Sequence, residues 1–421
     1  MDKQNPKYSI LIPTVSRTGL VRTAIESVLK QTFRDFELII ADAGTLKGTE
    51  ELVNEIKADD VSVRYFRTPQ YPPFIPFNYS ESEARGEYFM WLDDDNYLLP
   101  FALEVLDKAV QKTGADIITA NHLYYYNDTH PRHYLRNSLG IIPFTYKENF
   151  VDPREILKWL YTFSHKDTTR VLPRLNPSGT LLSRKIAERA RERLGLVVFD
   201  DMPSCQPLAT TIPFAQSVYF MDRPVAIVGR IGESMSQTWS IKARKRFEKK
   251  RFAPTNFSPL TAYTRLNARI EIYLRAKNLL PDLFKDIEIN YDAFAWLYLH
   301  ELFYLDTGIR TAIRNWKNFF EFLKTRSPET QKQLHKKAKK MMFAVPFIYL
   351  TRRLKLHHVA RWLLSFKRKT SINKKTPRQK FQGTREFEIP LTKYKGVDSI
   401  ESLADHLQEI VQKEIGIDIY S

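Results

Sequence analysis

Three consecutive carboxylates, Asp93, Asp94 and Asp95, are the residues of this sequence whose types and spacing most clearly suggest chemistry. They directly follow the apolar run 89–92, which predicts a buried strand. Open α/β sheets bind their ligands at this carboxyl end of a strand. Adjacent like charges repel one another, and a cation relieves the repulsion; oxygen-only ligands favour Mg2+ or Mn2+. The alternative is a solvated acidic turn without a ligand.

Apolar runs and helical periodicity predict the elements that must position these acids. Residues 8–14 and 36–41 predict two strands, with an amphipathic helix over 20–29 between them, and Asp42 follows the second strand. Further strands are expected at 61–66 and 115–120, and further helices near 48, before Arg85 and over 101–112. This alternation predicts an α/β fold, Rossmann-like, with a mostly parallel sheet flanked by helices.

The chain changes character after about residue 240, and its 421 residues are enough for two or three domains. We expect a catalytic α/β domain over 1–240, a mostly helical and aromatic region over 241–334, and a basic amphipathic region over 335–421. The last region is predicted to end in a helix between Asp398 and Ile415.

The C-terminal region is strongly basic in a chain whose net charge is +17. Residues 335–385 contain 16 Lys or Arg and no Asp or Glu, with large apolar residues between the charges. Such interleaving is typical of a segment lying on an anionic membrane surface. Binding to a polyanion such as nucleic acid is a second interpretation. An ordinary helix with a solvated charged face is the third.

The sequence also bears on the cellular compartment. A single cysteine, Cys205, fits a reducing environment. The polar start, residues 1–7, predicts no signal peptide, and no run approaches the roughly 20 apolar residues that span a bilayer. We therefore expect a cytoplasmic protein, either free or peripheral on the inner face of the membrane.

Four blocks in order and spacing carry a resemblance to a known family. They cover residues 9–14, 24–32, 35–42 and 84–95 within the range 8–120, and they read SILIPT, AIESVLKQT, DFELIIAD and ARGEYFMWLDDD. The chain resembles family 2 glycosyltransferases of the GT-A fold. The resemblance implies an inverting enzyme that transfers a sugar from a nucleotide-diphospho-sugar to an acceptor hydroxyl.

The family assigns roles by position. Asp93 and Asp95 match its D-x-D motif, in which the first acid contacts the ribose side of the nucleotide and the second helps to hold Mn2+ or Mg2+ on the diphosphate. Asp42 matches an acid that contacts the base. The implied metal ligands are Asp95 and Asp93, and the implied donor-binding set is Pro13, Thr14, Asp42, Asn78, Asp93 and Asp94. Strand alternation predicts that the side chain of Asp94 points away from its neighbours.

The implied catalytic base lies in the second half of the α/β domain. Family members carry an acidic pair there, and its Asp accepts the proton of the acceptor hydroxyl. By position this residue is Asp201, with Asp200 as the rival if the alignment slips by one residue. The alternative for either residue is an N-cap of the helix that follows.

Some positions depart from the family pattern. Ala43 stands where a second acid is usual, Phe77 stands where Arg is common, and no His lies between His165 and His300, where many members carry a metal-reaching His. The implied function is a metal-dependent transferase in cell-surface polysaccharide or glycolipid synthesis, with a donor that we expect to be a UDP-sugar and a glycan or lipid-linked acceptor. The alternatives are a catalytically weakened nucleotide-sugar or carbohydrate binding module and a polyanion-binding protein. Nucleic acid is the less favoured partner, because it leaves the first 240 residues unexplained.

Overall fold

The computed structural model describes residues 5–15, 17–45, 47–56, 60–69, 74–130, 135–163, 175–198, 207–232, 258–260, 265–304, 309–353 and 387–420. The chain forms two compact units. Unit 1 comprises residues 1–157, 168–237 and 376–421, and unit 2 comprises residues 158–167 and 238–375. Each unit is described by itself below.

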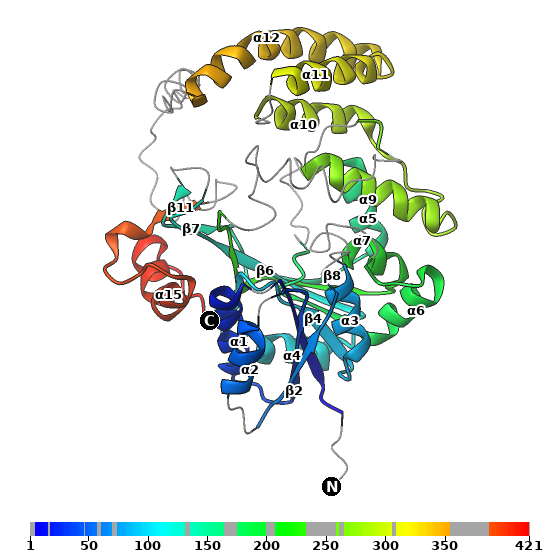
Figure 1. Cartoon of the computed structure of the whole chain (residues 1–421). Coiled ribbons are helices and arrows are strands. Elements are labelled where there is room, and N and C mark those ends of the chain that lie inside the picture. Colours follow the sequence, from blue (N-terminus) through cyan, green and yellow to red (C-terminus); the bar gives the residue numbers. More distant parts are fainter. Residues whose placement is uncertain are drawn as a thin grey trace. The chain divides into compact units, whose positions relative to one another are not determined.

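Unit 1 is built on a mixed sheet of eleven strands among the described residues (Figure 1). Its main order is β11-β7-β6-β9-β4-β1-β2-β3, and β10 pairs with β5, β6 and β8. The strands β3, β2, β1 and β4 run parallel, and β9 runs antiparallel to both β4 and β6. The bounds are β1 Tyr8–Thr14, β2 Phe36–Asp42, β3 Ser62–Arg67, β4 Tyr88–Trp91, β5 Asn96–Leu98, β6 Ile117–Tyr126, β7 Ser138–Ile141, β8 Glu148–Val151, β9 Thr180–Ser183, β10 Val218–Gly229 and β11 Phe387–Pro390.

Helices cover the parallel strands on both faces, as alternating α and β segments predict. The helices of unit 1 are α1 Thr18–Leu29, α2 Gly48–Glu55, α3 Ile75–Glu83, α4 Ala102–Thr113, α6 Arg184–Leu194, α7 Pro207–Thr211 and α15 Ile400–Ile415; α5 Pro153–Thr162 begins in it. Ile10, Ile12 and Met90 belong to one core cluster with α1 and α4. Trp91 faces the other side, where its indole N–H donates to the Phe77 carbonyl of α3 at 3.2 Å. The predicted α/β class is confirmed, although the sheet is mixed: parallel pairing joins β4, β1, β2 and β3 and also joins β6 to β10, and the other pairs are antiparallel.

The register of the parallel strands brings their carboxyl ends together. Thr14 lies opposite Asp42 on the neighbouring strand, and Leu11 lies opposite Trp91. The backbone N–H of Ala43 donates to the Thr14 carbonyl at 2.9 Å, which continues the pairing past the end of β2. The acid triplet, Thr14 and Asp42 therefore occupy one edge of the sheet.

The C-terminal segment is part of this α/β unit. β11 pairs antiparallel with β7, and α15 packs its apolar face, including Leu403, Leu407 and Ile410, onto strand residues such as Leu123. Ser399 caps α15 by accepting the backbone N–H of Ser402. The terminal helix was predicted, but the sequence grouped it with the basic region, because strand pairing across some 240 residues leaves no local signal.

Unit 2 is helical, as expected for the region after residue 240. Its further helices are α9 Arg265–Leu279, α10 Tyr291–Tyr304, α11 Ile309–Lys324 and α12 Pro328–Arg353. Buried aromatic side chains pack between them: Phe294 contacts Tyr298 and Phe322, and Tyr298 stacks on Phe319. The described helices include none that is both long and apolar enough to cross a membrane.

Candidate active site

The middle acid of the triplet is the one held most firmly by the protein. Asp94 is only 2% exposed, and its carboxylate accepts the Thr14 hydroxyl at 2.6 Å and the Arg17 Nε–H at 3.1 Å. A second Arg17 nitrogen completes a bidentate ion pair. The expected direction of the Asp94 side chain rested on strand alternation. Strand alternation does not apply to it, because β4 ends at Trp91 and residues 94 and 95 form a turn.

The outer two acids, Asp93 and Asp95, have raised pKa values. Burial, followed by repulsion from Asp95 and Asp94, raises the pKa of Asp93 to about 7. Burial and then the charge of Asp94 raise the pKa of Asp95 to about 6, although Arg17 and Arg230 act in the opposite direction. Burial also opposes the charge on Arg17, but the acids together raise the pKa of its guanidinium. The ionised forms of Asp93 and Asp95 therefore lack sufficient compensation from the protein alone.

A divalent cation fits this donor set. Asp94 is engaged by Thr14 and Arg17, which leaves Asp93 and Asp95 as the carboxylates whose charge a cation would balance. Over the described residues, no group of three or more His, Cys, Asp or Glu side chains surrounds a common metal position. Two carboxylates are nevertheless the usual protein share of a Mg2+ site that is completed by substrate phosphates and water.

Residues from two distant segments fix the turn that carries the acids. The Ser178 hydroxyl accepts the Asp93 backbone N–H at 3.2 Å and the Asn96 side-chain N–H at 2.6 Å. The side-chain amide oxygen of Asn96 accepts the backbone N–H of Gly229 at 3.0 Å. A Cβ at position 229 would lie 2.0 Å from the Asp95 carbonyl oxygen, so only glycine allows β10 to pass this close. These contacts hold the turn that carries the acids in place.

Asp42 lies at the same edge and is fully buried. Its carboxylate accepts the backbone N–H of Gly44 at 2.7 Å and the Tyr65 hydroxyl at 3.3 Å. Pro13 and Thr14 end the adjacent strand, with Pro13 opposite Ala41 in the register. These residues are brought together as predicted, and their contact with a donor stays a prediction.

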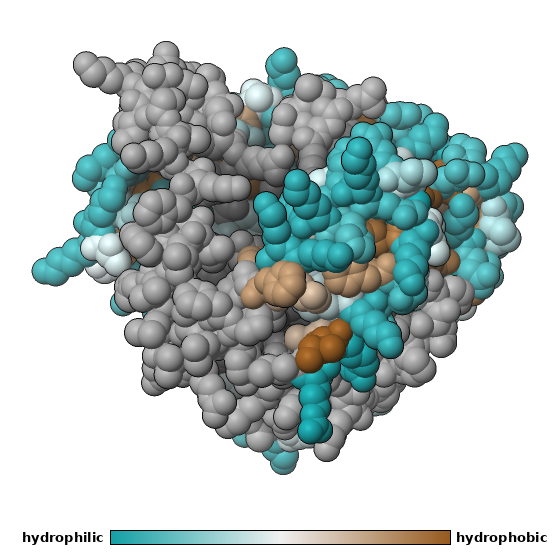
Figure 2. Space-filling model, turned by 90° about the horizontal axis from the view of Figure 1, so that it is seen from above, coloured by the Kyte–Doolittle hydropathy of each residue, from teal (hydrophilic) through white to brown (hydrophobic). Residues whose placement is uncertain are grey.

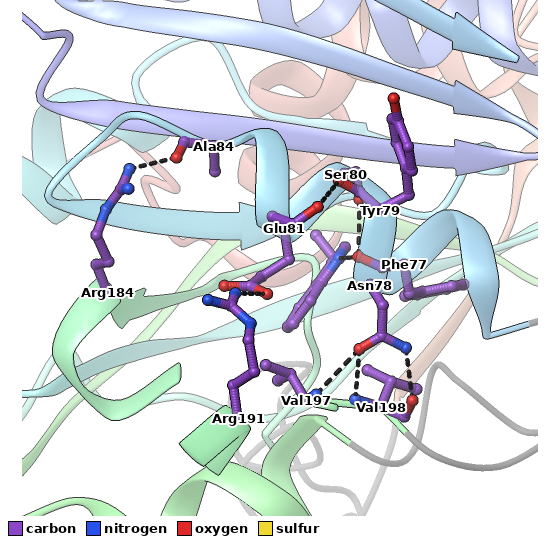
Figure 3. Close-up of polar contacts among 12 residues, drawn as sticks. Phe77, Asn78, Tyr79, Ser80, Glu81, Ala84, Arg184, Arg191, Val197 and Val198 are labelled. Atoms are coloured by element: carbon purple, nitrogen blue, oxygen red, sulfur yellow. Dashed lines mark hydrogen bonds and ion pairs between the residues drawn. The ribbon is translucent and has the colours of Figure 1, made fainter. Parts of the chain in front are cut away.

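Asn78 differs from the other predicted donor-binding residues in its contacts, because its side-chain amide binds backbone groups. Its amide nitrogen donates to the Val198 carbonyl at 2.6 Å and the Phe74 carbonyl at 3.1 Å, while its oxygen accepts the backbone N–H groups of Val197 and Val198, each at 3.0 Å (Figure 3). Both ends of the side-chain amide therefore bind backbone, which argues against the predicted donor contact. Asn78 instead ties α3 to the segment that precedes Asp200 and Asp201.

Neighbouring contacts reinforce that connection. Arg191 of α6 forms an ion pair with the buried Glu81 of α3, and Arg184 bonds the carbonyls of Ala84 and Gly86, the latter at 3.0 Å (Figure 3). Thr210 donates to the Val197 carbonyl at 2.6 Å from the far side of the gap. Asp200 and Asp201 lie outside the described residues, which stop at Val198 and resume at Pro207. Their predicted catalytic role is therefore untested.

Three functional candidates were missed from the sequence. Arg17 and Arg230 place positive charge beside the acids, and Ser178 holds their turn. A signal for Arg17 was available, because a cation directly after the first strand lies at the same sheet edge as the acids. Arg230 and Ser178 are distant in sequence and gave no such signal.

Sequence comparison relates the part of the chain that carries the acid triplet to a known family. Residues 9–185 match the family model "Glycosyl transferase family 2". This part of the chain is therefore similar to glycosyl transferase family 2, the family that the sequence blocks resemble.

Two curated relatives illustrate the range of similar proteins. The GalNAc(5)-diNAcBac-PP-undecaprenol beta-1,3-glucosyltransferase of Campylobacter jejuni is 36% identical over 103 residues, which are 24% of this chain and 33% of the relative. The chondroitin synthase of Pasteurella multocida is 32% identical over 118 residues, which are 28% of this chain and 12% of the relative. The matches thus span a third or less of these relatives.

Two solved structures that match the chain do so at low sequence identity. S. aureus TarS 1–349 in complex with UDP-GlcNAc has a TM-score of 0.47 and 12% identity, with 83% of this chain and 92% of that chain covered. The mannosyltransferase PcManGT from Pyrobaculum calidifontis, in complex with GDP-Man and Mn2+, has a TM-score of 0.38 and 14% identity, with 83% and 88% covered.

Proposed function

We propose that the chain transfers a sugar from a nucleotide-diphospho-sugar to an acceptor hydroxyl, with Asp93 and Asp95 holding a divalent cation against the donor diphosphate. The observation that carries this proposal is that the three acids of the triplet have different surroundings. Asp94 is neutralised by Arg17, whereas Asp93 and Asp95 are partly buried carboxylates with raised pKa values. A cation bound there supplies positive charge to the departing diphosphate, an effect worth several kcal/mol.

The residues of the chain have separate tasks in the proposed reaction. Asp42 and Thr14 lie where the nucleotide would bind, at the edge formed by β1, β2 and β4. Arg17, with its side chain about a quarter exposed, forms the ion pair with Asp94 and adds positive charge beside Asp95, 3.9 Å away. Asp201 accepts the proton of the acceptor hydroxyl while the oxygen of that hydroxyl attacks the anomeric carbon. The single displacement that results inverts the anomeric configuration.

We propose Asn78 as a positioning residue for this base. Its amide holds Val197 and Val198 through three hydrogen bonds, and Asp201 follows Val198 by three residues. Three residues span at most about 10 Å of chain, so the hold at Val198 restricts where Asp201 can reach. This role replaces the direct donor contact expected from the sequence.

The nature of donor and acceptor is proposed from the relatives. TarS is solved with UDP-GlcNAc, and the C. jejuni relative is named for a substrate linked to undecaprenol through PP. We propose a UDP-sugar donor, a glycan or lipid-linked acceptor in cell-surface polysaccharide or glycolipid synthesis, and action at the cytoplasmic side.

A donor screen tests the binding half of this proposal. Common nucleotide sugars are added singly, with and without Mn2+, and the melting temperature is measured. A donor at about 100 times its Kd should add ~2.7 kcal/mol, or roughly 5–10 °C for a domain of this size. We expect one UDP-sugar to stabilise the protein only when Mn2+ is present. The proposal fails if every nucleotide sugar leaves the melting temperature unchanged.

A further inference from the structure

Helices α11 and α12 of unit 2 pack against each other around the turn 325–327 and carry an unusual charge. Residues 309–343, here called the basic hairpin, contain ten Lys or Arg and two Glu, a net charge of +8. Eight of these cations are exposed: Arg310, Arg314, Lys317, Lys324, Lys332, Lys336, Lys339 and Lys340. Glu321 already pairs with Lys324 at 2.8 Å, so the hairpin itself can neutralise only a small part of its charge.

The basic hairpin also exposes large apolar side chains. Phe343 is 77% exposed and Ile313 is 64% exposed, the two highest values for large hydrophobic residues in the described part of the chain. Both lie toward the end of the hairpin opposite its turn, because a rise of 1.5 Å per residue puts them about 25 Å and about 20 Å from residue 326. Exposed apolar groups within a charged surface are typical of interaction sites.

The cations and Phe343 share a helix face. Lys332, Lys336, Lys339 and Phe343 follow one another at spacings of four, three and four residues, which places them on one side of α12. The opposite side of the helix buries Leu334 and Ala338 in unit 2. On the face drawn in Figure 2, hydrophilic side chains lie around a small group of apolar ones.

We infer that the basic hairpin docks on a membrane surface rich in anionic lipid. Clustered Lys and Arg side chains attract such a surface, and aromatic and aliphatic side chains insert at the boundary between headgroups and acyl chains. A nucleic acid would use the cations, but it gives no reason to expose Phe343 and Ile313. The sequence directed attention to residues 335–385; the structure adds the cations and Ile313 of α11, while residues 354–386 lie outside the described part.

The docking inference is independent of the donor chemistry, because none of its residues belongs to the candidate active site. The test of this inference requires substitutions within the full-length chain, because a shortened chain would lose part of unit 1. Removing the chain after residue 334 would delete β11 and α15, which complete the core of unit 1. Loss of binding by a shortened chain would therefore say nothing about the hairpin.

The test is co-sedimentation of the full chain with vesicles of phosphatidylglycerol and phosphatidylcholine in equal parts, compared with phosphatidylcholine alone. The double variant Lys336→Glu/Lys339→Glu should reduce binding at least about tenfold, since each cation near an anionic surface contributes strongly. Phe343→Ala should reduce binding at high salt, where charge attraction is screened. The double variant Lys185→Glu/Lys395→Glu carries the same charge change on exposed positions of unit 1 and should bind like the unaltered protein.

Melting temperatures of all variants confirm that they fold. Equal binding by the hairpin variant and its control would overturn the inference, as would equal binding to vesicles with and without phosphatidylglycerol. Tighter binding to duplex DNA than to vesicles, lost in the same hairpin variant, would assign the surface to nucleic acid instead.

Discussion

Asp95→Ala should abolish stabilisation of the protein by Mn2+ with a nucleotide sugar, while the melting temperature without ligands stays the same or rises. The pKa of Asp95 is raised to about 6 by burial and by Asp94. A carboxyl whose pKa is raised on folding costs stability at pH values above that pKa, so at neutral pH its removal relieves the fold. Thermal unfolding at pH 7, with and without Mn2+ and donor, measures both effects.

Asp94→Ala is the matched control and should lower the melting temperature of the protein without ligands. It leaves Arg17 and Thr14 without the carboxylate that they bind in a largely buried position. Breaking such a pair costs about 3 kcal/mol, or roughly 6–12 °C in melting temperature. If Asp95→Ala lowers the melting temperature as much as Asp94→Ala, or if Asp94→Ala leaves it unchanged, the assignment of different roles to these two acids is wrong.

Asp201→Asn should lower turnover at least ~100-fold and leave donor affinity nearly unchanged, because it keeps the size of the side chain and removes its basicity. Steady-state kinetics with the donor found in the screen give kcat and the donor KM separately. Asp200→Asn is the control and should retain most of the activity. Should Asp200→Asn abolish turnover while Asp201→Asn does not, the base is Asp200 and the alignment is off by one residue.

Asn78→Ala provides a second variant for the same step. It removes the hydrogen bonds to Val197 and Val198 without touching the acid triplet. A positioning residue should lower kcat and leave the donor KM largely intact, whereas the direct donor contact expected from the sequence would raise KM. The ratio of these two effects therefore distinguishes the two roles.

Local patterns were sufficient to predict the parallel strands and the edge where the acids meet. The apolar runs at 8–14, 36–41 and 89–92 become β1, β2 and β4 within a few residues, because such runs are consistent with little else in an alternating α/β chain. The helix between Asp398 and Ile415 was predicted as well, and it appears as α15, which buries Leu403, Leu407 and Ile410.

Contacts between distant segments could not be predicted in this way. Asn78 was assigned to the donor by position, yet its amide binds a backbone segment some 120 residues away. The bond between Asn96 and Ser178 and the approach of Gly229 to Asp95 depend on how β9 and β10 join the sheet. Periodicity describes one element at a time and carries no information on such pairings.

The direction of the Asp94 side chain could not be derived from strand alternation. Alternation holds only while the strand lasts, and β4 ends two residues before the triplet. Beyond the end of β4, the backbone conformation of the turn determines the direction of each side chain, and Asp94 forms an ion pair with Arg17. The presence of a site was therefore predictable, while the role of each acid required the structure.

The most direct test of the account is release of nucleotide diphosphate from the donor in the presence of Mn2+. The protein is incubated with the nucleotide sugar that stabilises it, with and without a chelator, and nucleotide diphosphate is quantified by chromatography; Asp95→Ala and Asp94→Asn are run alongside. We predict slow release through transfer of the sugar to water, lost with chelator and in Asp95→Ala, and faster release when a suitable acceptor is added. Tight donor binding with no release under any condition would contradict the account and identify a nucleotide-sugar binding module.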